Sequence, residues 1–232
     1  IVAVSGIYLF IFFDTGIERA FQSVEYLTND HWYHAGVMRS LHRYASDLMV
    51  VCMVLHLLRE FSLDRYRGTR WFSWFTGIPL VWLLYISGIT GYWLVWDMLA
   101  QYVAVVSAKL LDVFPVFGEP LARNFLTPEH LSSRFFSLLV FLHIAVPLVL
   151  LGLVVAHLLA LHDVGSNNPD GVEIKGPKAP KDAQGHPLDG IPFHPYYTVH
   201  DILGVGVFLM IFSAIIFFAP EFGGYFLEYN NF

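Results

Sequence analysis

Two apolar stretches decide the fold: VMRSLHRYASDLMVVCMVLHLL at residues 37–58 and FFSLLVFLHIAVPLVLLGLVVAHLLALH at residues 135–162. Each is long enough for a helix that crosses the bilayer core, which takes about 20 residues. Each carries two histidines 14 residues apart, which are His42 and His56, then His143 and His157. Matched polar rings in two apolar helices indicate that these helices face each other inside a membrane.

The composition supports a membrane location for the whole chain. Of its 232 residues, 56% are apolar and 14% are charged, and the mean hydropathy is +0.57. Soluble domains have about 45–50% apolar and about 25% charged residues. The net charge of −6 and the single cysteine exclude a cationic nucleic-acid surface and a disulfide scaffold. We therefore expect an all-α integral membrane bundle, with lipid and other subunits as partners and no nucleic acid.

Uncharged runs and loops divide the chain further. The sequence predicts a single membrane domain over residues 1–232, with helices at about 1–13, 37–58, 71–96, 135–162 and 202–220, an amphipathic segment at 98–125 and an extramembrane loop at 163–195. The 1–13 run is too short to span, so we interpret it as the second half of a helix. Arginines at 59–70 and lysines at 175–181 favour the cytoplasmic side for both of these loops.

The spacing of the four histidines predicts a cofactor. Fourteen residues make just under four helical turns, or about 21 Å of axial rise, so each helix presents its two rings on nearly one face. Two such helices offer a pair of imidazoles at each of two levels, which is what a haem iron takes as axial ligands in a bundle. The alternative is four polar core histidines, but the doubled spacing favours ligands. A zinc site would need its ligands to converge at one point.

Glycines and arginines lie at related positions. Gly77 and Gly91 are also 14 residues apart, and they predict close approach of a flat cofactor, as does Gly6. The alternative for these glycines is close helix packing. Arg39 and Arg59 flank the first histidine pair by three residues on either side. They are predicted to pair with haem propionates, and interfacial snorkelling is the alternative.

These features resemble the amino-terminal, haem-bearing part of cytochrome b from bc-type quinol:cytochrome c oxidoreductases. The resemblance rests on the stretch from Ala20 to Arg59, the glycine pair, GSNNP at 165–169 and IPFHPYYT at 191–198. It implies two non-covalent b haems, with His42 and His143 holding the outer one and His56 and His157 the inner one.

The resemblance also implies partners and a location. The partners would be an iron–sulfur protein, a c-type cytochrome and, as in split members of the family, a separate subunit with the carboxyl-terminal half. Together they would form a dimeric multi-subunit complex that works with quinone in a bacterial inner membrane or an equivalent energy-transducing membrane. Electrons would pass across that membrane between the two haems.

An inner quinone site is implied by the same resemblance. Its residues would be His162, Ser166 and Asp201, with His200 where the family usually has lysine. A histidine and a carboxylate near water can supply the protons that quinone reduction needs. Asp201 also suits the N-cap of a helix that begins at Ile202, and both roles can coexist.

The outer quinol site departs from the family pattern. Val95 stands where the family has proline, Val103 where it has glycine, and a Pro-Glu-Trp-Tyr segment is absent. In split members of the family that segment resides on a separate subunit, so its absence alone decides nothing. Val95 and Val103 motivate a rival hypothesis, a dihaem transmembrane electron wire that has an inner quinone site and no working outer site. A non-redox transporter would favour broken helices with charges at mid-membrane, whereas the uncharged runs here are continuous.

Overall fold

The computed structural model describes residues 1–111, 113, 132–164, 180–186, 188 and 192–223. Within these ranges the chain forms helices and turns and no strand. The α-helices are α1 (Val2–Phe12), α2 (Ala20–Glu25), α3 (Val37–Ser62), α4 (Trp71–Trp93), α5 (Met98–Leu111), α7 (Ser133–Val164) and α8 (Tyr196–Phe218). Two π-helical turns, Tyr26–Asp30 and Trp32–Gly36, join α2 to α3, and a 3-10 turn at Gly68–Arg70 precedes α4.

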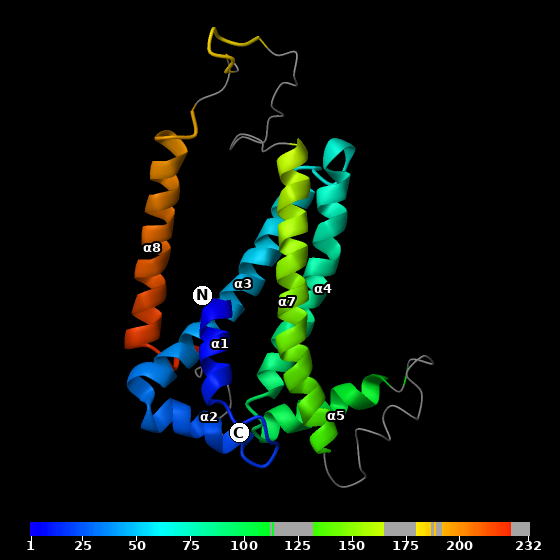
Figure 1. Cartoon of the computed structure of the whole chain (residues 1–232), viewed down its shortest axis with the longest axis vertical. Coiled ribbons are helices and arrows are strands. Elements are labelled where there is room, and N and C mark those ends of the chain that lie inside the picture. Colours follow the sequence, from blue (N-terminus) through cyan, green and yellow to red (C-terminus); the bar gives the residue numbers. More distant parts are fainter. Residues whose placement is uncertain (112, 114–131, 165–179, 187, 189–191, 224–232) are drawn as a thin grey trace.

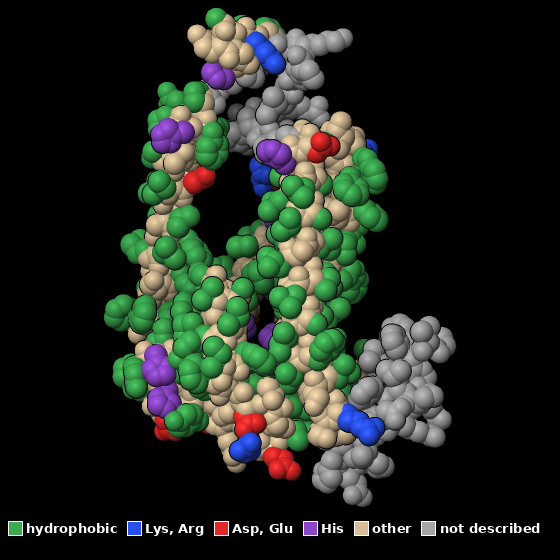
Figure 2. Space-filling view, in the orientation of Figure 1, with side chains coloured by type: hydrophobic (Ala, Val, Ile, Leu, Met, Phe, Trp, Pro, Cys, Tyr) green, Lys and Arg blue, Asp and Glu red, His purple; other side chains and the backbone are tan. Residues whose placement is uncertain are grey.

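Four helical segments are long and apolar enough to cross a membrane: Trp32–Ser62, Gly68–Trp93, Ser133–Val164 and Tyr196–Phe218. Their outward side chains are largely apolar and exposed, and Figure 2 shows them covering the sides of the molecule. An apolar surface of this extent is unfavourable in water and suits the hydrocarbon of a bilayer. The predicted all-α integral membrane bundle is confirmed.

The long helices run along the vertical axis of Figure 1. Helices α4 and α7 lie side by side in opposite directions, α3 crosses beside them, and the short α1 packs against α3. Helices α2 and α5 lie across the lower end. Helix α8 stands on the other side of α3, which it contacts near its own carboxyl end.

Two apolar clusters hold these helices together. At the lower end, Trp96 packs edge-on against the buried Phe136, with ring centroids 4.6 Å apart, and both belong to a cluster drawn from α2, α4, α5 and α7. A second cluster joins Ala45 of α3 to Phe212 and Ile216 of α8. Tyr44 extends this contact by donating a hydrogen bond of 2.5 Å to the carbonyl of Pro220. Both clusters lie toward one end of the bundle.

The start of the last helix differs from the prediction. Helix α8 begins at Tyr196 rather than at 202, and Pro195 occupies the N-cap without a side-chain cap hydrogen bond. Asp201 therefore lies within the helix, and its prediction as an N-cap that opens the helix was wrong. Proline is tolerated at a helix start, where its missing N–H would have no acceptor. The first turn is polar and aromatic, so hydropathy alone missed it.

Other boundaries moved by smaller amounts. Helix α3 continues past 58 to Ser62, and α4 ends at Trp93 rather than at 96. The chain turns directly after α4, where Trp96 has a φ of 58°. Of the predicted amphipathic segment, α5 covers Met98–Leu111, and the remainder lies almost wholly outside the described residues, as does most of the 163–195 loop.

Candidate functional site

The first histidine pair lies between α3 and α7. The rings of His42 and His143 have centroids 6.1 Å apart and planes at 82°. Two metal–imidazole bonds of about 2.0 Å each fit within that separation. The pair therefore has the ring spacing to hold one metal ion between its two imidazoles.

Each of these two rings is oriented through its Nδ1 atom. His42 Nδ1 lies 3.1 Å from both the carbonyl of Val2 and the Oγ of Ser5. His143 Nδ1 lies 3.0 Å from the carbonyl of Ser87. A carbonyl can only accept, so Nδ1 carries the proton in both rings, and Nε2 keeps its lone pair for a metal.

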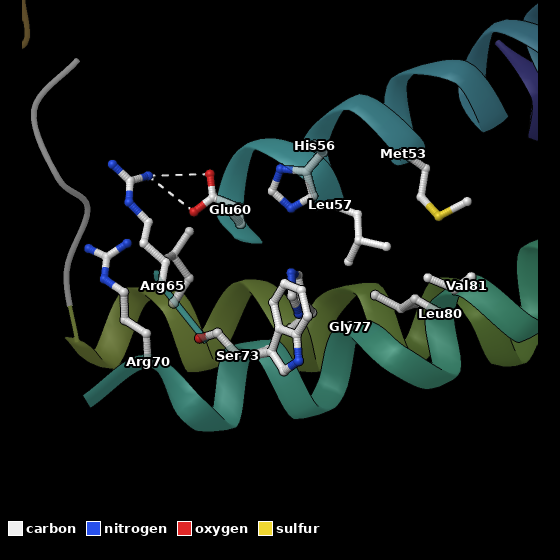
Figure 3. Close-up of a pocket in the computed structure, with 13 residues that line it drawn as sticks. Met53, His56, Leu57, Glu60, Arg65, Arg70, Ser73, Gly77, Leu80 and Val81 are labelled. Carbon is white, nitrogen blue, oxygen red and sulfur yellow. Dashed lines mark hydrogen bonds and ion pairs between the residues drawn. The ribbon is translucent and has the colours of Figure 1, made fainter. Parts of the chain in front are cut away.

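The second pair lines a cavity near the other end of α3, α4 and α7. Its walls carry His56, His157 and Gly77, and its remaining lining is apolar except at the loop end (Figure 3). The apolar lining residues are Met53, Leu57, Trp74, Leu80, Val81 and Leu161, and the polar ones at the loop end are Glu60, Arg65, Arg70 and Ser73. An apolar cavity with a charged mouth suits a flat apolar cofactor that carries charged groups at one edge.

The predicted glycines face the histidine rings. A Cβ atom added to Gly91 would collide with the ring of His143, and one added to Gly6 would lie 3.1 Å from Cε1 of His42. At Gly77 the corresponding distance to Cε1 of His157 is 3.5 Å, which is ordinary contact. In the structure the missing side chains of Gly91 and Gly6 make room for the imidazoles of His143 and His42. Close approach of a cofactor to Gly6, Gly77 and Gly91 stays a prediction.

Thr76 is a site residue that sequence reasoning missed. Its Oγ1 lies 2.9 Å from Nδ1 of His157 and within hydrogen-bond distance of the carbonyls of Phe72 and Ser73. The hydroxyl donates to a carbonyl, so its oxygen accepts from Nδ1 of His157. One signal was available, since Thr76-Gly77 and Thr90-Gly91 repeat at the 14-residue interval.

Substitution of Thr76 by valine should weaken metal binding at His157. Loss of the hydroxyl removes an acceptor that orients the ring of His157, and such outer partners contribute about 10- to 100-fold in metal affinity. We expect faster loss of one haem on dilution or mild heating, followed by absorption. Thr90→Val is the matched control, because Thr90 is buried on the same helix and bonds to the Ile86 and Ser87 carbonyls. Equal rates of loss in the two variants would contradict this role.

The two predicted arginines have other partners. Arg59 pairs with Glu60 at 2.5 Å, and half of its side chain is exposed. Arg39 donates a hydrogen bond of 3.2 Å to Thr28. The arginines that line the cavity are Arg65 and Arg70, which the sequence analysis used only for membrane orientation. Pairing of Arg39 and Arg59 with propionates stays a prediction.

The predicted quinone residues lie toward the upper ends of α7 and α8. His162, His200 and Asp201 are exposed, and His200 Nδ1 donates to the carbonyl of Tyr196 at 2.7 Å. No hydrogen bond or ion pair among the described residues joins these three side chains. Figure 2 shows the molecule hollowed between α7 and α8. Ser166 lies outside the described residues.

A membrane bundle with one opposed imidazole pair and a second pair on a shared cavity has the features of a b-type membrane cytochrome. The model of the family "Cytochrome b(N-terminal)/b6/petB" matches residues 47–224. The chain belongs to this cytochrome b family.

Curated relatives support this assignment. Cytochrome b of Allochromatium vinosum is 39% identical over 235 residues, which cover 99% of this chain and 55% of that protein. Cytochrome b of Rhodospirillum rubrum is 33% identical and is matched over 97% of this chain and 53% of its own length. The chain thus spans about half the length of these relatives.

A solved structure shares the fold. A chain of a structure titled "Hyperthermophilic respiratory Complex III" superposes with a TM-score of 0.77 at 23% identity, over 95% of this chain and 57% of that one. At this identity the similarity shows the fold alone.

Proposed function

We propose that this chain is a dihaem b-type cytochrome subunit that carries electrons across a membrane between quinol or quinone and partner redox subunits of a bc-type complex. The observation that carries the proposal is the two-level placement of histidines from α3 and α7, with His42 and His143 directly opposed and His56 and His157 on one cavity. Membership of the cytochrome b family supports it.

The residues of this chain would bind, orient and shield the cofactors. Haem b bound at the two levels supplies one-electron transfer. His42 and His143 would hold one haem and His56 and His157 the other, so each iron would have two protein ligands and would not bind dioxygen. Ser5, the Ser87 carbonyl and Thr76 fix the rings, and the apolar helices exclude water.

We further propose an inner quinone site at the cytoplasmic ends of α7 and α8. His162 and Asp201 would deliver protons to the quinone oxygens, and Ser166 and His200 would complete the site. The family resemblance and the exposure of His162, His200 and Asp201 at one end of the molecule support it. The proposed partners are an iron–sulfur protein, a c-type cytochrome and a subunit with the carboxyl-terminal half, in a bacterial inner membrane or its equivalent.

One observation favours the electron-wire alternative. Val103, at the position where the family has glycine, packs on the buried cluster that contains Trp93 and Trp96. If the outer quinol site lies there, as the resemblance implies, the valine side chain would reduce its volume. In the wire, haem reduction by quinol would respond to inner-site inhibitors and not to outer-site inhibitors. Sensitivity to both classes would exclude the wire.

The main proposal is tested on the complex purified from its membrane. A pyridine haemochrome assay should give about two b haems per chain, and electron paramagnetic resonance should show low-spin iron with two imidazole ligands. A content of about one haem, or five-coordinate high-spin iron as the main species, would overturn it. The subunits that co-purify identify the electron partners.

A further inference from the structure

An arginine with unused donors lies at the mouth of the His56 and His157 cavity. Arg65 follows α3 in the turn before α4, and its side chain is only 10% exposed. Its Nη1 donates to both carboxylate oxygens of Glu60, at 3.3 and 3.1 Å. Its Nε and Nη2 are buried without a hydrogen-bond partner among the described residues. One nitrogen of this guanidinium is therefore satisfied and the other two are not.

The two unpaired nitrogens define the kind of ligand. Nε and Nη2 lie on one edge of the planar guanidinium and donate in parallel, which matches the two oxygens of a carboxylate. A buried charged donor without a partner costs more free energy than an ordinary hydrogen bond returns. Arg65 lines the same cavity as the two histidines, at its loop end, where Figure 3 shows its Nη1 bonded to Glu60 and the other two nitrogens on the side away from His56. A ligand that extends from the histidines to the mouth of the cavity would come close to this guanidinium.

We propose that Arg65 binds a propionate carboxylate of the haem held by His56 and His157. The inference rests on the proposed function and assigns a residue to one edge of that cofactor. Glu60 would act as a positioning residue, because it accepts hydrogen bonds from Nη1 of Arg65 and leaves Nε and Nη2 available for a ligand. It also pairs with Arg59, the arginine that the spacing had predicted for this contact.

The difference in burial explains why Arg65 suits the contact with a propionate better than Arg59. The Arg65 side chain is nine-tenths buried, whereas half of the Arg59 side chain is exposed, so water screens Arg59 more. The buried cation of Arg65 would offset the negative charge of the propionate. Since that carboxylate lies close to the iron, removal of the cation should stabilise the oxidised haem and lower its potential.

The test compares Arg65→Gln with Arg67→Gln in the purified complex. Arg67 is in the same turn, but its side chain is 69% exposed and pairs with Asp64 at 3.2 Å. In Arg65→Gln we expect the reduced-to-oxidised ratio of one haem at a fixed ambient potential to fall about three- to tenfold. The other haem and both haems of Arg67→Gln should keep their potentials.

Several outcomes decide the proposal. Unchanged potentials in Arg65→Gln at full haem content would overturn it, while selective loss of the affected haem from a folded complex would support it. If Arg65→Gln does not assemble, Arg65→Lys keeps the charge without the fork, so the potential should stay near that of the unaltered complex while the haem at His56 and His157 is lost faster on dilution. Unchanged retention of that haem in Arg65→Lys would overturn the proposal. Absence of two bis-histidine haems from the unaltered complex would instead refute the proposed function.

A lipid phosphate could offer the same two oxygens. The unaltered complex and Arg65→Gln are therefore both titrated in nanodiscs of phosphatidylcholine alone and with added phosphatidylglycerol. A propionate at Arg65 predicts an Arg65→Gln shift of the same size in both lipids. A shift that appears only with phosphatidylglycerol would assign the site to lipid and overturn the propionate assignment.

Discussion

Replacement of His157 by leucine is expected to lower the haem content from about two per chain to about one and to abolish electron transfer across the membrane. Leucine fills a similar volume without a metal-binding nitrogen, so the helix keeps its apolar packing and loses only the ligand. The Nδ1 of His157 is bonded to Thr76, which indicates a ring held for coordination. Haem content by pyridine haemochrome and flash-induced haem reduction would measure the two effects.

The control for this variant is His186→Leu. His186 is exposed in the described part of the long loop, where its backbone N–H donates to Asp182 at 2.7 Å and thereby holds the pKa of that carboxyl below its usual value. His186 lies outside the membrane helices, so its replacement should not change haem content or electron transfer. Retention of two low-spin haems in His157→Leu would contradict the ligand assignment.

Substitution of Gly91 by alanine is expected to remove or loosen the haem at the His42 and His143 level. The added methyl group would lie inside contact distance of the His143 ring, and overpacking of this kind costs about 1–3 kcal/mol. The ring cannot easily move away, because its Nδ1 is bonded to the carbonyl of Ser87. We expect a haem content between about one and two per chain and a lower melting temperature.

Gly88→Ala is the matched control for Gly91→Ala. Gly88 lies on the same helix, and a Cβ atom there would meet nothing within 4 Å. Its substitution should leave haem content unchanged and slightly favour the helix, since alanine has the higher helix propensity. A graded series would add Gly6→Ala, with its 3.1 Å approach to His42, and Gly77→Ala, with 3.5 Å to His157. Equal haem contents in Gly88→Ala and Gly91→Ala would contradict the steric argument.

The membrane helices were predictable because hydropathy reports directly on burial in lipid. The His42 and His143 contact was predictable as well, because a helix converts a 14-residue spacing into position on a face. The start of α8 was not, because the turn from Tyr196 carries polar groups and reads as loop by hydropathy. A helix that extends beyond the hydrocarbon needs no apolar residues there.

The roles of the arginines depend on the path of a turn and not on periodicity. Asp64 and Gly68 adopt positive φ values of 54° and 65°, which fold the chain between α3 and α4 and bring Arg65 back to the cavity. The position of Arg65 at the cavity cannot be predicted from its sequence spacing to His56. Arg59 could be placed from helical geometry, but its pairing with Glu60 could not, because neighbouring side chains choose among several rotamers.

The 14-residue interval occurs on three helices at once, as His42 to His56 on α3, Gly77 to Gly91 on α4 and His143 to His157 on α7. Each interval corresponds to about 21 Å of helix. Because α4 packs against both α3 and α7, a stretch of any one of these helices is resisted by the other two. In the proposed function the tunnelling distance between the cofactors is then set by helical rise alone, so it should stay constant while loops and subunits around the bundle move.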